Sequence, residues 1–245
     1  MEMVAKKFFS ASSGLLFFCC LLSGLSLSLT LERPSVSVDW GKAPQRQSAA
    51  AEANNPPNRL FGTVEFRGPI KGVPQWERIV RLCKNKTGIT DDFALAGAGR
   101  RAEAQAWEKI KADMANATPM QKLQAVNKFM NMWPYRTDME VYGVLDYWGT
   151  PAEFIKNSGD CDCFSIAKFF ALIELGFSQE NLRVVALKDR IRNIDHAILV
   201  AYVDNDVFIL DNVSPLVLSH NKYGHYQPIF SVNLEYKWMH VMPSK

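Results

Sequence analysis

The segment from Ser158 to Gly176 constrains the fold more than any other part of the chain. After the turn Ser158-Gly159, most residues from Cys161 to Leu175 are apolar, and Gly176 is a natural helix stop. A helix that is apolar around most of its girth must be covered by other parts of the chain on nearly every side. We therefore expect this helix to be the buried central helix of a folded domain.

The chain around this helix divides into an earlier helical part and a later strand-rich part. Apolar residues at helical spacing, or a capping pattern followed by proline, predict helices at four places. These are Pro74–Lys84, Arg100–Ala115, a helix opened by Thr118-Pro119 and a short helix opened by Thr150-Pro151. Strands are predicted at Leu60–Phe66, Leu182–Leu187, Ala197–Val203, Val207–Leu210 and around Phe230–Met239. Helices followed by a sheet indicate an α+β fold.

The N-terminal region has the pattern of an export signal. Lys6 and Lys7 precede an apolar run at about Leu15–Leu29, which is short for a membrane-spanning helix and is rich in small residues near its end. An uncleaved inner-membrane anchor is the alternative. Ala43–Arg59 has the composition of a linker. We predict a signal peptide at residues 1–28, a flexible segment at 29–59 and one folded domain at 60–245.

Charge excludes one class of function and identifies no partner. The chain has 28 basic and 25 acidic residues, for a formal net charge of +3, and 48% of its residues are hydrophobic. A protein that binds nucleic acid through its charge concentrates far more lysine and arginine. The composition is that of an ordinary globular protein, which argues against disorder throughout the chain and against several membrane spans.

Three cysteines lie outside the signal: Cys83, Cys161 and Cys163. An odd number in an oxidising compartment leaves at least one free thiol, which points to a functional cysteine. Cys161 is the strongest candidate, since it stands in the first turn of the predicted central helix, where unpaired amides and the helix dipole favour a thiolate nucleophile. A structural cysteine at a helix start is the alternative.

A cysteine nucleophile needs a base and an acid that orients the base. If Asp204-Asn205 is a two-residue hairpin loop, Val203 pairs with Asp206, and His196 falls on the same sheet face as Asp211. A three-residue loop would put the two side chains on opposite faces. The other histidines have no comparable acid partner and are expected at the surface or in the core: His220, His225 and His240.

Asp160 and Asp162 flank the candidate nucleophile. Two carboxylates at these positions should raise the pKa of the Cys161 thiol and disfavour the thiolate. A hard divalent cation such as Ca²⁺, which takes oxygen ligands, would neutralise them. The alternative is a pair of solvated aspartates that are favourable at a helix start through the helix dipole.

From about Val126-Asn127 to the C-terminus, the chain resembles the bacterial transglutaminase-like cysteine proteinases of the LapG type. The motifs that carry the resemblance are Asp146-Tyr147-Trp148-Gly149-Thr150-Pro151, Glu153-Phe154, Gly159-Asp160-Cys161, Ser165-Ile166-Ala167-Lys168, His196-Ala197 and Leu210-Asp211-Asn212. Their order and spacing agree with the family. Leu60–Ala117 matches more loosely.

The resemblance implies a papain/transglutaminase-like fold, with a helical N-terminal lobe and a central nucleophile helix packed on an antiparallel sheet. It implies a triad of Cys161, His196 and Asp211, and Ca²⁺ held by Asp160 and Asp162. It also implies a periplasmic endopeptidase that cuts a large repeat-rich adhesin near its N-terminus at a di-alanine site. This cut releases the adhesin and disperses biofilm. The implied partner is the periplasmic domain of an inner-membrane, LapD-like cyclic-di-GMP receptor.

The chain departs from the family pattern after the nucleophile. The family usually has two acidic residues there, whereas Asp162, in place of the longer glutamate, is followed by Cys163. Both changes bear on calcium affinity. Cys163 also raises the hypothesis of a strained Cys161–Cys163 disulfide, with a simply buried Cys163 as the alternative.

Two other functions remain open on the sequence. One is a transglutaminase-type acyl transferase, which incorporation of a labelled amine into a glutamine peptide would reveal. The other is a catalytically inactive calcium-dependent binding module, which stoichiometric labelling of Cys161 by a thiol-directed inhibitor would argue against. Four aromatic residues either line a substrate groove or pack in the core: Trp133, Tyr135, Tyr147 and Trp148.

Overall fold

The computed structural model describes residues 59–243. The predicted signal peptide and nearly all of the predicted flexible segment lie outside the described residues, so both stay predictions. The helices are α1 Pro74–Cys83, α2 Thr90–Ala96, α3 Arg101–Asp113, α4 Pro119–Met130, α5 Asp138–Tyr142, α6 Pro151–Asn157 and α7 Cys161–Glu174. Within residues 59–243, no helix has both the length and the apolar character that a membrane span requires.

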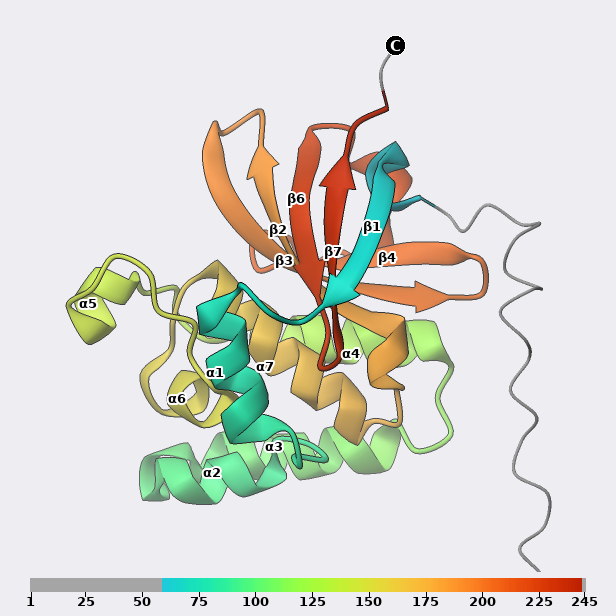
Figure 1. The fold of residues 1–245 in the computed structure, drawn as a ribbon. Coiled ribbons are helices and arrows are strands. Elements are labelled where there is room, and N and C mark those ends of the chain that lie inside the picture. The colour runs from blue at the N-terminus through green and yellow to red at the C-terminus, as the bar shows by residue number, and fades with distance from the viewer. Residues whose placement is uncertain (1–58, 244–245) are drawn as a thin grey trace, which may run out of the picture. The chain divides into compact units, whose positions relative to one another are not determined.

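The strands form one antiparallel sheet of seven strands in the order β1-β7-β6-β2-β3-β4-β5. Their bounds are β1 Val64–Pro69, β2 Leu182–Asp189, β3 Ile194–Val203, β4 Asp206–Leu210, β5 Leu218–Ser219, β6 Tyr226–Val232 and β7 Tyr236–Val241. Figure 1 shows the strands above the helices, with α7 beneath the sheet, where it packs on β3 and β2. The predicted α+β class is confirmed.

Helix α7 is the centre of the main core. It is buried continuously from Asp162 to Leu172, and it packs against α4 and α6 as well as the sheet. Phe169 is fully buried and meets the Trp76 ring of α1 edge to face, at 5.8 Å between centroids. Full burial of a large apolar side chain contributes about 1.5–3 kcal/mol. The apolar residues on nearly every side of this helix therefore account for its central position, as predicted.

The β3–β4 hairpin has the predicted two-residue loop. Asp204 and Asn205 both have positive φ, at 51° and 59°, which the turns of tight hairpins require. Val203 pairs with Asp206, and the register continues to Leu199 opposite Leu210. This register decides which side chains share a face at the ends of the two strands.

Two strand predictions are corrected. The single strand expected around Phe230–Met239 is two strands, β6 and β7, because Asn233 closes a turn between them. Its side-chain oxygen accepts hydrogen bonds from the amides of Glu235 and Tyr236, at 2.9 and 2.7 Å. The strand expected at Leu60–Phe66 begins later, since Phe61 has φ 52° within a 3₁₀ turn at Leu60–Gly62.

The helices at Pro74, Arg101, Pro119, Pro151 and Cys161 begin within one residue of the predicted starts. Two short helices were not predicted. Helix α5 begins at a capping box formed by Thr137 and Glu140, a signal that the aromatic composition of its surroundings obscures. Helix α2 has only seven residues and no side-chain cap.

Candidate active site

The turn before α7 places Cys161 in the first helical position. Ser158 has φ 66°, and Gly159 follows in close contact with the helix, since a Cβ at Gly159 would lie only 2.5 Å from Cβ of Cys163. The carbonyl of Gly159 accepts a hydrogen bond from the Arg136 amide at 2.9 Å. The close approach requires glycine at position 159 and fixes the entry into α7. Cys161 is partly exposed there.

His196 and Asp211 meet as the hairpin register predicts. Nε2 of His196 lies 3.0 Å from Oδ1 of Asp211. Because this contact engages Nε2, Nδ1 is the ring nitrogen left to exchange a proton with a reacting group. His196 lies near the start of β3, and Asp211 directly follows the end of β4. Their meeting confirms the same-face prediction.

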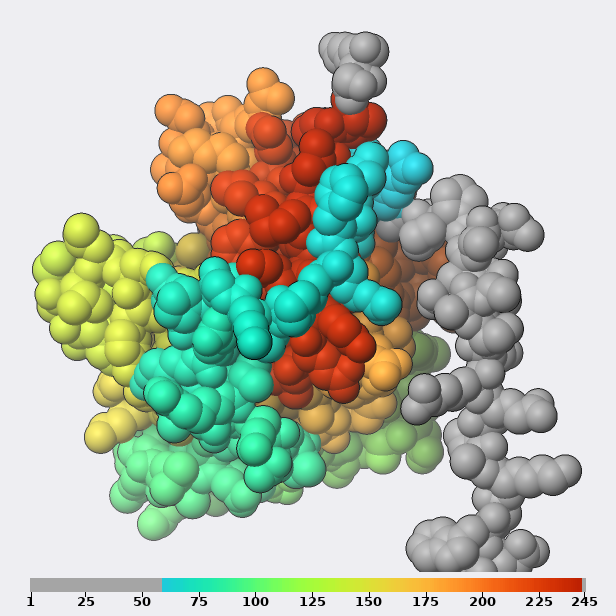
Figure 2. Space-filling view, viewed as in Figure 1, coloured from blue at the N-terminus to red at the C-terminus, as the bar shows by residue number. Residues whose placement is uncertain are grey.

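Cys161 and His196 line one cavity of about 740 Å³. The backbone amide of Ala197, next to His196, is one of the groups that lower the pKa of the Cys161 thiol. The cavity is bounded by the start of α1, parts of the segment 135–148, the start of α7, and strands β2, β3, β6 and β7. In Figure 2 the yellow-green segment 135–146, the teal start of α1 and the red strands meet on one face. The structure thus places Cys161 and His196, the predicted nucleophile and base, in the lining of one open cleft.

Asp211 is fully buried, and both of its carboxylate oxygens accept hydrogen bonds. Oδ1 accepts from the Val213 amide at 3.1 Å as well as facing His196, and Oδ2 accepts from the Tyr226 hydroxyl at 2.6 Å. Burial alone would raise the pKa of Asp211. The interactions with His196, Tyr226 and Val213 outweigh burial and hold the pKa below its ordinary value.

Four carboxylates and a thiol gather beside the nucleophile. Ligand atoms of Asp138, Asp146 and Asp162 lie within 4.8 Å of one another, as do those of Asp138, Asp160 and Cys163. We call Asp138, Asp146, Asp160 and Asp162 the acidic cluster. Asp162 is 6% exposed and Asp138 is 2% exposed. The alternative of two solvated aspartates at a helix start is therefore wrong for Asp162.

The acidic cluster is electrostatically incomplete. Burial and then the neighbouring carboxylates raise the pKa of Asp160 to about 6, and the same causes raise the pKa of Asp162 well above its ordinary value. The Oδ1 atoms of Asp138, Asp160 and Asp162 are buried and have no hydrogen-bond partner among the described residues. Buried carboxylate oxygens without donors, at this spacing, fit a hard divalent cation such as Ca²⁺. Cys163 is the one poor calcium ligand of the group.

The same carboxylates act on the nucleophile. Burial, followed by the charges of Asp162 and Asp160, raises the pKa of the Cys161 thiol well above its ordinary value. The amides of Ala197 and Asp162 lower it, but by less. A cation held by the acidic cluster would reverse the contribution of the carboxylates and favour the thiolate.

The structure has three free cysteines among its described residues. Cys163 is fully buried, and its sulfur accepts a hydrogen bond from the Gly149 amide at 3.2 Å. Cys161 and Cys163 are both free thiols and form no disulfide in this structure. Burial raises the pKa of Cys83 to about 11, which fits an inert core cysteine.

The comparisons with known proteins agree with this geometry. The family model described as bacterial transglutaminase-like cysteine proteinase BTLCP matches residues 98–245. The chain belongs to the bacterial transglutaminase-like cysteine proteinases. As a member of this family it is a cysteine peptidase, and the predicted transglutaminase-like fold is confirmed.

Solved structures of Legionella pneumophila LapG resemble this proteinase. One is 28% identical, with a TM-score of 0.56, and the match covers 63% of this chain and 87% of that chain. The calcium-bound structure is 29% identical with a TM-score of 0.52, covering 66% and 86%. The EGTA-treated structure is 29% identical with a TM-score of 0.51, covering 66% and 84%. None of the curated proteins compared with the chain matches it. The chain is thus a LapG-like cysteine protease.

The aromatic residues of the proteinase divide between the two expected roles. Tyr135 is 56% exposed and lines the cavity, as does Trp148, which is also packed against Trp76 and Phe230. Trp133 is buried in the core. The remaining aromatic residue has a structural role: the Tyr147 hydroxyl contacts Arg78 and Glu153.

The other histidines have structural surroundings. Nδ1 of His220 accepts a hydrogen bond from the Phe61 amide at 3.0 Å. His240 lies between the hydroxyls of Thr63 and Ser231, and burial lowers its pKa to about 4. The His225 ring lies 4.4 Å from the Tyr226 ring at an interplanar angle of 59°, and it makes no hydrogen bond to Asp211. The expectation that none of the three is the base agrees with this geometry.

Sequence reasoning missed three parts of the site. Asp138 lies in the unpredicted helix α5, and Asp146 was noted only as part of a family motif. Tyr226 has no local signal that connects it with Asp211. The capping box of Thr137 was the local sequence signal that could have indicated helix α5, in which Asp138 is the first residue.

Proposed function

We propose that this chain is a calcium-dependent cysteine endopeptidase in which Cys161 is the nucleophile, His196 the base and Asp211 the orienting acid. The observation that carries the proposal is the 3.0 Å contact between His196 and Asp211 at the cavity that Cys161 lines. These three residues come from separate elements, and their meeting at an open cleft suits acyl-group chemistry on a peptide.

In the proposed reaction, Sγ of Cys161 attacks the scissile carbonyl carbon while Nδ1 of His196 takes the thiol proton. The S–C bond forms and the carbonyl oxygen becomes an oxyanion, for which backbone amides at the start of α7 are candidate donors. The C–N bond then breaks, and His196 gives its proton to the leaving amine. Water, deprotonated by His196, cleaves the thioester and restores Cys161. Asp211 stabilises the imidazolium throughout.

Asp160 and Asp162, joined by Asp138 and Asp146, are the residues that would hold Ca²⁺. When bound, the ion supplies positive charge beside the nucleophile. Ligand atoms of Asp138, Asp146 and Asp162 lie within 4.8 Å of one another, and so do ligand atoms of Asp160, Cys161 and Asp162. The calcium-bound Legionella pneumophila LapG structure supports this assignment.

The proposed substrate is the N-terminal region of a large repeat-rich surface adhesin, cut at a di-alanine site to release the adhesin and promote biofilm dispersal. The proposed location is the periplasm, reached through the N-terminal signal, with inner-membrane anchoring as the alternative. The proposed partner is the periplasmic domain of a cyclic-di-GMP receptor. The family membership, the likeness to LapG and the signal pattern of residues 1–28 support these assignments.

The decisive experiment is cleavage of an adhesin N-terminal fragment by the purified protein, with calcium, with a chelator and with Cys161→Ala. Cleavage that requires both calcium and Cys161 is the expected result. Cleavage by Cys161→Ala would refute the nucleophile. Incorporation of a labelled amine in place of hydrolysis would move the assignment to acyl transfer, and cleavage that ignores the chelator would remove calcium from the proposal.

A further inference from the structure

Tyr226 contacts the buried side of Asp211, away from the cleft. It is the first residue of β6 and is 6% exposed. Its hydroxyl donates to Oδ2 of Asp211 at 2.6 Å, while Oδ1 faces His196 at 3.0 Å. The carboxylate is thus held at both oxygens, one by the base and one by a phenol. A short hydrogen bond to a buried carboxylate is among the stronger kinds.

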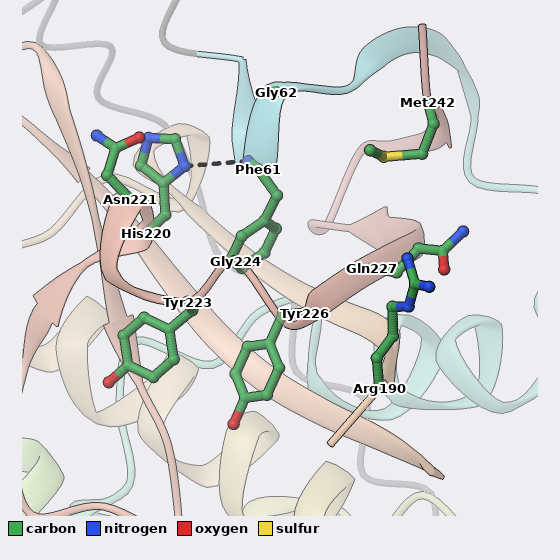
Figure 3. Close-up of a pocket in the computed structure, with 10 residues that line it drawn as sticks. All are labelled: Phe61, Gly62, Arg190, His220, Asn221, Tyr223, Gly224, Tyr226, Gln227 and Met242. Atoms are coloured by element: carbon green, nitrogen blue, oxygen red, sulfur yellow. Dashed lines mark hydrogen bonds between the residues drawn. The ribbon is translucent and has the colours of Figure 1, made fainter. Parts of the chain in front are cut away.

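The ring of Tyr226 is held in place by other rings. Tyr223 stacks on it at 5.2 Å, and the rings of Phe61 and His196 meet it edge to face at 6.1 and 6.0 Å. Tyr226 also lines a smaller cavity of about 300 Å³ with Phe61 and Gly224. Figure 3 shows its hydroxyl directed away from Phe61 and Gly224. The phenol is therefore oriented before any substrate arrives.

We propose that Tyr226 is a positioning residue of the active site: by holding Oδ2 of Asp211, it fixes the carboxylate so that Oδ1 faces Nε2 of His196 and Nδ1 is turned to the cleft. This inference rests on the proposed function and extends it, because it makes the orienting element of the triad a pair of residues from β6 and the end of β4. Nothing else among the described side chains donates to Oδ2.

The charges around this pair set the expected pH behaviour. Three basic side chains interact electrostatically with Asp211: His196 from β3, Lys168 from α7 and Arg192 from the β2–β3 loop. Nε of Arg192 also forms an ion pair with Asp189. Lys168 is fully buried, and its ammonium has no hydrogen-bond partner among the described residues. It cannot replace the Tyr226 hydroxyl as a donor without moving.

Tyr226→Phe removes one of the interactions that hold the pKa of Asp211 down, and leaves burial, which raises it. Asp211 in this variant takes up a proton at higher pH than in the wild type. The acid side of the pH profile for Cys161 reactivity should therefore move to higher pH. A residue that only supports the fold would lower the amount of active protein without moving the profile.

The test is alkylation of Cys161 by iodoacetamide at a series of pH values and at saturating calcium for every variant, read by mass spectrometry of the Cys161 peptide. Sulfur displaces iodide from the methylene carbon, and His196 holds the thiol proton, so the rate reports the cysteine–histidine pair without any peptide substrate. We expect Tyr226→Phe to react about tenfold more slowly near neutral pH, equivalent to about 1.4 kcal/mol, with its acid limb at higher pH.

One control and a second variant accompany Tyr226→Phe. Tyr202→Phe removes a buried phenol that has no hydrogen-bond partner among the described residues, and it should match the wild-type profile. Difluorotyrosine at position 226 keeps the ring and is a stronger donor, so it should move the acid limb to lower pH. This variant decides the question if Tyr226→Phe does not fold.

The two proposals fail in different ways. If wild-type Cys161 reacts no faster than Cys161 in His196→Ala, the proposed triad is wrong. If wild-type Cys161 is activated by His196 but Tyr226→Phe and the difluorotyrosine protein share the wild-type profile, the triad stands and the role of Tyr226 is refuted.

Discussion

Asp211 and Asp162 are both buried carboxylates of the same site, yet their surroundings are opposite. Asp211 is fully buried and satisfied at both oxygens, and its pKa lies below the ordinary value. Asp162 is 6% exposed, has a buried oxygen without a partner and lies among other carboxylates, and its pKa is well above the ordinary value. Similar burial has opposite effects on the two pKa values, because hydrogen-bond donors surround Asp211 whereas other carboxylates surround Asp162.

The difference shows which part of the site the chain completes by itself. In the cluster of His196, Asp211 and Tyr226, hydrogen bonds to both carboxylate oxygens already stabilise the negative charge of Asp211. The acidic cluster reaches a comparable state only when a positive charge joins it. Cys161, the proposed nucleophile, is the first residue of α7 and lines the same cavity as His196, Asp160 and Asp162.

The largest loss of cleavage activity is expected when the cluster of His196, Asp211 and Tyr226 loses the charge of Asp211. Asp211→Asn removes the charge that stabilises the His196 imidazolium, and the cleavage rate should fall by about 10⁴-fold. The measurement is the rate constant for cleavage of an adhesin fragment at saturating calcium. Asp204→Asn, on the same hairpin but in its loop, is the control and should retain wild-type activity. Retention of most activity by Asp211→Asn would contradict the assignment of the acid.

The second prediction is that neutralising Asp162 and neutralising Asp211 have opposite effects on the melting temperature of the calcium-free protein. Asp162→Asn should weaken calcium binding by about tenfold to a hundredfold, because one ligand charge is lost. In the calcium-free protein, the same change removes like-charge repulsion and should raise the melting temperature, whereas Asp211→Asn should lower it. Calorimetry with and without calcium measures both. Asp195→Asn, which is exposed at the cleft, is the control, and an unchanged calcium affinity in Asp162→Asn would exclude this residue as a ligand.

A smaller change in calcium affinity is expected when Cys163, beside the acidic cluster, is replaced by an oxygen ligand. Cys163→Asp replaces a poor calcium ligand with a carboxylate and should tighten calcium binding by about tenfold. Cys163→Ser removes the thiol without adding charge and should stay near the wild-type affinity. Calcium titration of the two variants distinguishes them, and weaker binding by Cys163→Asp would show that the sulfur position faces away from the ion.

The smallest effect concerns the stability of the calcium-free protein. The pKa of Asp160 is raised from 3.8 to about 6, so the folded state binds this proton more tightly than the unfolded state does. The free energy of unfolding should therefore fall as the pH rises from about 4 to 6 and stay low above that, by an amount on the order of 1 kcal/mol. Denaturant melts in chelator measure it. Asp160→Asn should flatten the dependence, and an unchanged slope in this variant would contradict the prediction.

Local patterns predicted the elements that carry the catalytic residues. The apolar girth of α7 fixed its central position, and the Asp204-Asn205 loop fixed the register that brings His196 to Asp211. Each of these patterns lies within about 20 residues of chain. Capping boxes at Thr118 and Thr150 located two further helices for the same reason.

The parts that were missed depend on contacts between distant segments. Asp138 reaches Asp160 only because the chain near Tyr135 lies alongside Gly159, and no periodicity in either segment encodes this pairing. Tyr226 reaches Asp211 through the place of β6 in the sheet, where β2 and β3 separate it from β4. The split between β6 and β7 depends on one asparagine side chain, which strand propensity does not reveal.

The unpartnered carboxylate oxygens beside Cys161 also bear on how long the enzyme stays intact before it acts. Burial, followed by the charges of Asp162 and Asp160, raises the pKa of the Cys161 thiol, and a protonated thiol reacts more slowly with peroxides than a thiolate does. In the proposed mechanism, calcium held by the acidic cluster favours the thiolate. If calcium controls the thiol in this way, the sensitivity of Cys161 to hydrogen peroxide should increase with the calcium concentration.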